Sequence, residues 1–443
     1  MLLLLLLLAI ILIVFTTVKL KLHPFLALLL VAIAYGLASG MSLELLVKSI
    51  NDGFGDTLGK IGIVIVLGVM IGSFLENTGG AYVLADKVLK LTGKKNIPLG
   101  MSLIGWIVSV PVFADSGFVV ITPLNKALTK KAGLSLSVTA IALATGMLAS
   151  HSLVPPTPGP IAAAGILNAD LGFVIFGGAI ISLLSIGPVL LFTKYFASRT
   201  FIDPNPDLSE EEVKLKTKEA PNSFSSALPI VIPILLIVLS SFNNYLHWFS
   251  VGYAFEVITF LGTPVIALLI GLGFAFLLPK KLEGKMISEN GWLGNSLKSA
   301  AIILMITGAG GVFGKVLQNS GMAEIIGGSF VSSNFGIWQP FLIAAAIKTA
   351  QGSTTVAMIT TASIVAPIMV QLGFETEISR ALAVLAIGAG ACVVSHVNDS
   401  YFWVVTQLSG MDISKGYRLH SFASGVLGLS AGILVFIAYL FFA

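Results

Sequence analysis

The sequence predicts an all-α polytopic membrane protein made of two inverted-topology repeats, each with five crossings and one re-entrant hairpin, and with broken helices at the midplane. Four observations lead to this fold class. The 443 residues are 56% hydrophobic and 10% charged. Apolar stretches of roughly 17 to 25 residues, long enough to cross a bilayer, recur along the chain. Basic residues collect in alternate loops, and the two halves of the chain resemble each other.

The orientation follows from the lysines and arginines. Loops that hold most of the 25 basic residues alternate with loops that hold only Lys48, Lys60, Lys315 and Arg380. Because basic loops stay in the cytoplasm, the chain is predicted to lie in a bacterial inner membrane with both termini in the periplasm. The net charge of +4 therefore indicates topology and no nucleic-acid partner, and the single cysteine, Cys392, excludes a disulfide framework.

The first predicted repeat covers residues 1–196. Its first span, 1–18, is interpreted as a retained helix, because it has no basic segment before it and no obvious cleavage site. An inward-opening hairpin is predicted at 98–124, where a first arm too short to cross is flanked by cytoplasmic lysines and FADSG breaks the tip. A broken helix is predicted at 134–168, interrupted by SHSLVPPTPGP.

The second predicted repeat covers residues 227–443 and follows a cytoplasmic linker at 197–226, which is polar and contains SEEEVKLKTKE. An outward-opening hairpin is predicted at 338–372, where AQGSTT interrupts an apolar segment with few basic residues at its flanks. A broken helix is predicted at 381–407, interrupted by SHVNDSYF. The order of the parts is therefore the same in both halves.

Sequence similarity between the halves supports the repeat. Residues 55–81 resemble residues 294–323, and their ends, ENTGGA and QNSGMA, are offset by 242 positions. A Ser-His pair follows in each half, at Ser150-His151 and at Ser395-His396. An odd number of crossings in each half turns the second copy upside down, which is typical of secondary transporters.

The four breaks predict a binding site for an anion. Helix breaks at membrane depth occur where they face protein or a wet cavity. A good N-cap follows each break here, namely Asp115 or Ser116, Thr157, Ser353 or Thr354, and Asn398 or Asp399. Free N–H groups and the positive ends of helix dipoles attract an anion, while hydroxyls and amides suit a polyhydroxylated chain. The predicted substrate-binding residues are Asp115, Ser116, Gly117, Thr157, Gly159, Gln351, Gly352, Ser353, Thr354, Asn398 and Ser400.

Proton coupling is predicted to involve Asp115 or Asp399, aided by His151 or His396, because a carboxylate inside the membrane is costly unless it has a function. The alternatives are that the aspartates are plain N-caps and that the histidines make structural hydrogen bonds. Lys348 has two interpretations, a contact with the substrate carboxylate or snorkelling to the surface. We expect Glu76 to have a structural or interfacial role.

The sequences ENTGGA, PVFADSG with VVITPL, ASHSLVPPTPGPIAAAGIL and SHVNDSYFWVV resemble the gluconate permease (GntP) family of the ion transporter superfamily, and the resemblance covers nearly the whole chain. It implies uptake of gluconate or a related sugar acid with protons, no enzymatic activity and no cofactor. It also implies a scaffold, a transport domain that moves like an elevator, and a homodimer in the lipid bilayer. Members of the family differ in substrate among gluconate, related sugar acids, glycerate and D-serine.

Three other functions remain open at this point. A sodium-coupled carboxylate transporter of the same fold is the nearest, since hairpin tips and unwound carbonyls also hold Na⁺. An ion channel is disfavoured by the paired hairpins, which indicate alternating access. A membrane-embedded hydrolase is not supported, because the sequence contains no HExxH motif.

Overall fold

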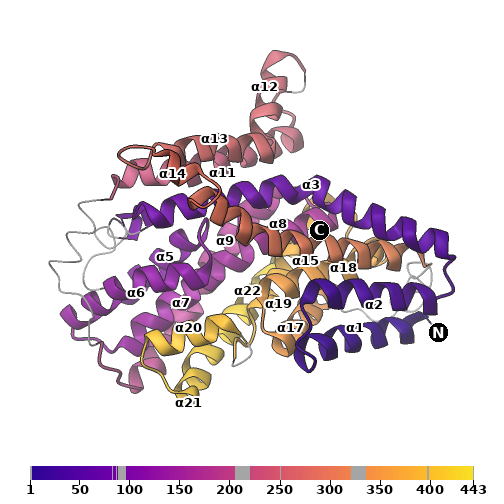
Figure 1. Ribbon diagram of the computed structural model, residues 1–443. Helices are drawn as coiled ribbons and strands as arrows, with labels where there is room; N and C mark the ends of the chain where they lie inside the picture. Colours follow the sequence, from indigo (N-terminus) through magenta and orange to yellow (C-terminus); the bar gives the residue numbers. More distant parts are fainter. Residues whose placement is uncertain are drawn as a thin grey trace.

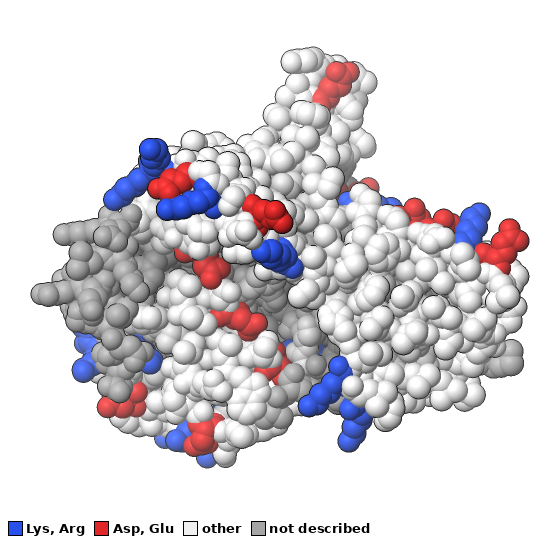
Figure 2. Space-filling view, in the orientation of Figure 1, with Lys and Arg blue, Asp and Glu red and all other residues white. Residues whose placement is uncertain are grey.

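The computed structural model describes residues 2–81, 83–85, 87, 96–204, 220–249, 251–320, 336–396 and 399–442. Every regular element in these ranges is helical, which confirms the all-α class. Five of the described helical segments are long and apolar enough to cross a membrane, and up to seven when two bent pairs are each counted as one span. Figure 2 shows that most Lys and Arg on one face lie near its edges, that several Asp and Glu lie in a hollow left of its centre, and that much of the right-hand part is uncharged. Five crossings in each repeat stay a prediction.

One group of helices is built on two long helices, and we call it the long-helix group. In it α3 (Leu43–Asn77) and α15 (Trp292–Asn319) pack antiparallel to each other. The group also contains α2 (Pro24–Ala38), α11 (Ser223–Leu246) and α13 (Pro264–Phe276). Figure 1 shows α3 running along the molecule with α11 and α13 beside it and α12 (Tyr253–Gly262) protruding. The remaining helices on this side are α1 (Leu2–Val18), packed on α2, and α14 (Gly284–Ile287).

The second group contains the short helices, and we call it the hairpin group. Its elements are α5 (Ile97–Ser109), α6 (Ala114–Lys131), α7 (Leu136–Leu153), α8 (Pro158–Leu167), α9 (Leu171–Tyr195), η2 (Ala197–Arg199), α17 (Trp338–Gln351), α18 (Thr354–Val365), η3 (Ala366–Ile368), α19 (Glu377–Cys392), α20 (Ser400–Leu408), α21 (Ile413–Gly416), η4 (Tyr417–Ser421) and α22 (Phe422–Phe442).

The core of the hairpin group is formed by α7 and α19, which are almost completely buried. Both are rich in alanine, glycine and serine, and such small residues let helix backbones approach closely inside a membrane. A Cβ added to Gly146 of α7 would lie 2.0 Å from the carbonyl oxygen of Ser102 on α5. The packing of α5 on α7 therefore depends on the absence of a side chain at this position.

Four interruptions separate α5 from α6, α7 from α8, α17 from α18, and α19 from α20. Ser353 caps α18 by accepting a hydrogen bond from the N–H of Val356 (3.3 Å), as predicted. Asp399 caps α20 by accepting from the N–H of Tyr401 (3.0 Å), also as predicted. Thr157 is the N-cap residue of α8, but its hydroxyl donates to the Val154 carbonyl (2.7 Å).

Two sequence predictions need correction. Neither Asp115 nor Ser116 caps α6, because the backbone changes from extended to helical at Phe113, which places both residues within the first turn. Their side chains are thereby free for other contacts. In addition, α11 begins at Ser223, within the range predicted as linker, because Asn222 caps it by accepting from the N–H of Ser225.

The close contact between α5 and α7 gives a testable prediction. Gly146→Ala should destabilise the protein by about 1–3 kcal/mol, because the added methyl group overpacks the crossing. Gly187→Ala in α9 is the matched control, since nothing lies within 4 Å of a Cβ built there. Thermal unfolding in detergent would measure both; equal midpoints would show that the α5–α7 crossing tolerates a larger residue.

Candidate functional site

A cavity of about 110 Å³ lies where three of the helix interruptions meet, and we call it the central cavity. The N-terminal ends of α6, α18 and α20 all contribute to it. Helix N-termini present unpaired N–H groups and positive dipole ends, so the cavity suits an anion without needing a free cation. Its lining residues are Phe113, Ala114, Asp115, Leu148, His151, Ser353, Thr354, Thr355, Asp399, Ser400 and Tyr401.

Asp115 and His151 present buried polar atoms without a partner to this cavity. The Oδ2 atom of Asp115 accepts a hydrogen bond from Ser400 Oγ (3.2 Å), which links α6 to α20. The Asp115 Oδ1 atom is buried and has no hydrogen-bond partner among the described residues, and the same holds for His151 Nδ1. Because buried polar groups are normally paired, both atoms are positioned for a ligand or a proton.

Lys348 and Asp399 form a buried ion pair at one side of the cavity. The Lys348 side chain is 0% exposed, and its Nζ atom lies 2.6 Å from Asp399 Oδ2. Lys348 also donates to the carbonyl of Gly352, and Ser395 Oγ donates to the same Asp399 oxygen (2.5 Å). The snorkelling interpretation of Lys348 is therefore wrong, because its ammonium group is held inside the protein by Asp399. In this structure the carboxylate that it meets belongs to the chain.

A second layer of hydrogen bonds supports this ion pair. His420, fully buried in the π-helical turn η4, places Nε2 3.1 Å from Ser395 Oγ. Since the Ser395 hydroxyl donates to Asp399, the His420 ring donates to Ser395. Ser421 donates to the Ser395 carbonyl, and Ser424 accepts from the Ser395 N–H (3.0 Å). Single π-helical turns often mark functional sites, and here the turn fixes the residue that orients Asp399.

The structure brings six of the predicted site residues together and places others elsewhere. Asp115, His151, Ser353, Thr354, Asp399 and Ser400 line the central cavity. Ser116 lines a different cavity, and Thr157 lies in a small adjoining space with Phe113 and His151. The side chain of Gln351 and the whole of Asn398 lie outside the described residues.

The remaining predicted residues have packing or backbone roles. A Cβ added to Gly117 would make ordinary contacts with Met147 and Val108 (3.4 Å), whereas one added to Gly159 would lie 2.9 Å from the Met358 sulfur, so Gly159 lets α8 approach α18. Gly352 ends α17 with a φ of 90°, a conformation that glycine adopts without strain, and its carbonyl accepts from Lys348. His396 donates from Nε2 to the carbonyl of Thr349 (2.7 Å) and does not line the central cavity.

Sequence reasoning missed Tyr401, Thr355 and His420. Tyr401 lines the cavity and donates from its hydroxyl to the Ala144 carbonyl (2.9 Å), which ties α20 to α7. Thr355 lies in AQGSTT and Tyr401 in SHVNDSYF, two interruptions identified in the sequence. Their position next to predicted site residues could therefore have pointed to them. His420 lies in a segment with no such motif, and only the folded structure brings it to Ser395.

Comparison with known proteins agrees with this geometry. Residues 1–441 match the description "GntP family permease". The chain belongs to the GntP permease family. It is 35% identical to a gluconate permease of Pseudomonas aeruginosa, an alignment that covers 95% of this chain and 93% of the relative. It is 32% identical to the high-affinity gluconate transporter of Escherichia coli K12, with 93% of each chain covered.

A further relative of this GntP permease is named for another substrate, and a solved structure has a similar fold. The Gnt-II system L-idonate transporter of Escherichia coli K12 is 32% identical, with 90% of each chain covered. The YdaH transporter of Alcanivorax borkumensis, whose crystal structure is described as revealing an unusual topology, superposes with a TM-score of 0.64. That superposition covers 95% of this chain and 99% of the other at 15% identity, and therefore shows similarity of fold alone.

These findings make the GntP permease a membrane permease and not an enzyme. The run GLSAG at 428–432 matches the pattern of a hydrolase nucleophile elbow, but it lies inside α22 and not at a strand-to-helix turn. Among the described residues, no group of three His, Cys, Asp or Glu side chains is arranged to hold a metal ion.

The buried ion pair gives a second prediction. Lys348→Met should destabilise the permease by about 3–5 kcal/mol, because it leaves the Asp399 charge buried without a partner. Adding Asp399→Asn should recover most of this loss, since the double variant removes both charges and asparagine still caps α20. Thermal unfolding in detergent would measure both variants.

The matched control is the exposed pair Lys415–Asp412, whose atoms lie 3.2 Å apart. Lys415→Met should cost much less than Lys348→Met, because solvent screens exposed pairs. A loss in Lys348→Met as small as in Lys415→Met would show that the buried pair does not constrain the fold.

Proposed function

We propose that this permease imports gluconate or a related small sugar acid by proton symport across the bacterial inner membrane, using an elevator-like, alternating-access motion. In this proposal both termini face the periplasm and the protein works as a homodimer. The observation that carries the proposal is the unpaired Oδ1 atom of Asp115 in a cavity lined by three helix N-termini. The relatives named for gluconate and L-idonate support the class of substrate.

The central cavity offers complementary groups to both parts of a sugar acid. The carboxylate is proposed to lie at the N-termini of α18 and α20, where N–H groups and dipole ends stabilise negative charge. The hydroxyls of Ser353, Thr354, Thr355 and Ser400 line the same space and suit the hydroxylated carbons. A carboxylate without hydroxyl groups would leave these side chains unpaired on binding.

Charge balance favours Asp115 as the residue that carries the proton. Asp399 is already neutralised by Lys348, whereas Asp115 has no cation bonded to it among the described residues. An ionised Asp115 would repel the substrate carboxylate, since two like charges 4 Å apart repel by about 4 kcal/mol in an environment of effective dielectric constant 20. Protonation of Asp115 removes this repulsion, so proton and anion bind together. His151, whose Nδ1 atom is unpaired at the same cavity, is proposed to pass the proton to or from Asp115.

Glycines on the two long helices support the inverted repeat and the sliding motion. Gly68 and Gly72 on α3 correspond to Gly310 and Gly314 on α15 through the same 242-residue offset that relates ENTGGA to QNSGMA. All four face the hairpin group, where an added Cβ would meet its atoms at 2.0 to 3.2 Å. Two glycines on each long helix let the hairpin group approach closely there, which suits a motion of one group of helices along the other.

The contacts of these glycines differ between the two halves, which supports an inward-facing position of the hairpin group. Gly72 faces the carbonyl of Pro111 at the tip between α5 and α6. Gly314 instead faces Ser363, which lies about 15 Å along α18 from its N-cap Ser353. For the α17–α18 tip to face Gly314 on α15, as the α5–α6 tip faces Gly72 on α3, the hairpin group would have to shift along α15 toward the predicted periplasmic side.

The coupling proposal predicts a specific phenotype for Asp115→Asn. This variant should bind the substrate and exchange labelled for unlabelled gluconate across proteoliposomes, because a neutral side chain does not repel the anion. It should lose accumulation driven by a proton gradient, since asparagine cannot release a proton. Asp412→Asn is the control, because Asp412 caps the surface helix α21 and lies outside the cavity. Normal accumulation by Asp115→Asn would exclude Asp115 as the coupling residue.

Uptake of labelled gluconate into proteoliposomes tests the coupling ion. We expect accumulation under an inward proton gradient, its collapse on addition of a protonophore, and no change when Na⁺ is replaced by K⁺. Dependence on Na⁺ would instead establish the sodium-coupled carboxylate transporter. Absence of gluconate uptake would direct the search to other small organic anions.

A further inference from the structure

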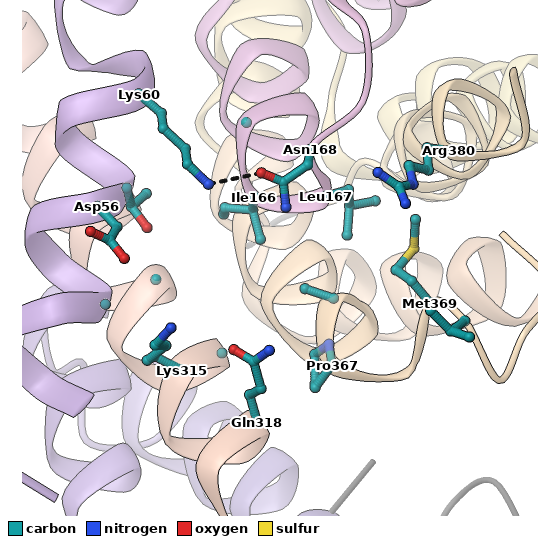
Figure 3. A pocket seen from close by; sticks show the side chains of 17 residues that line it. Asp56, Lys60, Ile166, Leu167, Asn168, Lys315, Gln318, Pro367, Met369 and Arg380 are labelled. Atoms are coloured by element: carbon teal, nitrogen blue, oxygen red, sulfur yellow. Dashed lines mark hydrogen bonds between the residues drawn. The ribbon is translucent and has the colours of Figure 1, made fainter. Parts of the chain in front are cut away.

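A cavity of about 260 Å³ lies between the long-helix group and the hairpin group, away from the residues of the central cavity. We call it the outer cavity, because its basic residues belong to the side of the membrane predicted to be periplasmic. Facing turns of α3 and α15 form one wall, while the ends of α8 and η3 and the start of α19 form the other (Figure 3). It therefore spans the boundary along which the proposed motion takes place.

The outer cavity gathers three cations from three different helices. Lys60 of α3, Lys315 of α15 and Arg380 of α19 all line it, together with one carboxylate, Asp56 (Figure 3). The Lys60 ammonium donates to Asn168 Oδ1 (2.8 Å), whereas in the described part of the chain neither Lys315 nor Arg380 has an ion-pair partner. The excess of positive charge in this concave space attracts anions.

The three basic residues of the outer cavity are most of those on the predicted periplasmic side, where basic residues are scarce. The predicted topology assigns only four basic residues to that side, and three of the four line this one cavity. The fourth, Lys48, is absent from its lining. Cations that serve only to orient the chain in the membrane have no reason to converge on a cavity.

A second cavity, at the position of the long-helix group that the repeat relates to the outer cavity, has a different charge. This inner cavity, of about 130 Å³, lies where α3 and α15 face the tip between α5 and α6. The 242-residue offset pairs Ser73 and Glu76, which line it, with Lys315 and Gln318 of the outer cavity. None of the described residues that line the inner cavity is basic.

We propose that the outer cavity is a capture site for small carboxylate anions, in which Lys60, Lys315 and Arg380 concentrate the anion before it reaches the central cavity. At the inner cavity Glu76 repels the anion, so that release toward the cytoplasm is favoured over rebinding. This proposal gives Glu76 a role that differs from the structural or interfacial one expected from the sequence. This inference rests on the proposed function for its direction of transport, but the charge of the outer cavity is testable without transport.

The first test measures transport kinetics. Lys60→Gln, Lys315→Gln and Arg380→Gln should each raise the KM for gluconate uptake roughly three- to tenfold at low salt and leave kcat within about twofold, because the charges speed the encounter and not the translocation. The effect should shrink as salt shortens the screening length, about 8 Å at 0.15 M. Lys48→Gln is the control and should leave KM unchanged. A KM in all three variants equal to that of Lys48→Gln would overturn the proposal.

The second test reads the local charge directly. Gln318→Cys places an exposed thiol in the outer cavity, and Val251→Cys places one on an exposed loop outside it, while the native Cys392 is buried. Negatively and positively charged methanethiosulfonate reagents of similar size are compared at each site. The anionic reagent should be favoured about tenfold at Gln318→Cys relative to Val251→Cys, and the preference should vanish when Lys315→Gln and Lys60→Gln are added.

Ligand protection separates the possible outcomes. Gluconate at millimolar concentration should slow labelling of Gln318→Cys by the anionic reagent in phosphatidylcholine vesicles. An equal reagent ratio at both cysteines would refute the capture site even in a permease that transports gluconate. Protection by acetate or lactate but not gluconate would keep the capture site and reject the proposed solute. Protection only by added phosphatidylglycerol would assign the cations to lipid headgroups and overturn the proposal.

Discussion

The buried ion pair between Lys348 and Asp399 is the interaction on which the central cavity depends. It joins the end of α17 to the N-terminus of α20, two segments that are separated by α18 and α19 in the chain. Lys348 also holds the carbonyl of Gly352, so the same ammonium group fixes the interruption before α18. Since a buried charge without a partner is costly, neither segment is able to move alone. The two helix N-termini that face the cavity from the second half are thereby set relative to each other.

The ion pair also determines which charges remain available to a substrate. Asp399 is satisfied by Lys348, by Ser395 and by its own helix, and His420 supports this arrangement from η4. Asp115 has a hydrogen bond from Ser400 and one oxygen without a partner among the described residues. Two aspartates that look equivalent in the sequence therefore differ in their partners. Both line the central cavity, but only Asp115 has a buried oxygen without a partner among the described residues.

Local signals in the sequence predicted the helix interruptions and the caps at Ser353 and Asp399, because these depend on residues close together in the chain. They failed for α6, where the backbone turns into a helix at Phe113 and not at a residue with a capping side chain. The pairing of Lys348 with Asp399 and the contact of His420 with Ser395 were not predictable from local patterns, since both join distant segments. Gly117 and Gly159 were predicted as site residues because they lie within FADSG and SHSLVPPTPGP, but in the structure neither lines the central cavity.

The self-neutral ion pair has an electrical consequence for the proposed cycle. Lys348 and Asp399 together contribute no net charge to the hairpin group, so the charge of the central cavity depends on Asp115 and the solute. Empty, with Asp115 ionised, the cavity holds one negative charge; loaded, with Asp115 protonated beside a monovalent anion, it holds the same. Both strokes then move equal charge, and a complete turnover transfers none. The accumulation that such a carrier reaches at equilibrium depends on the difference in pH across the membrane and not on the voltage.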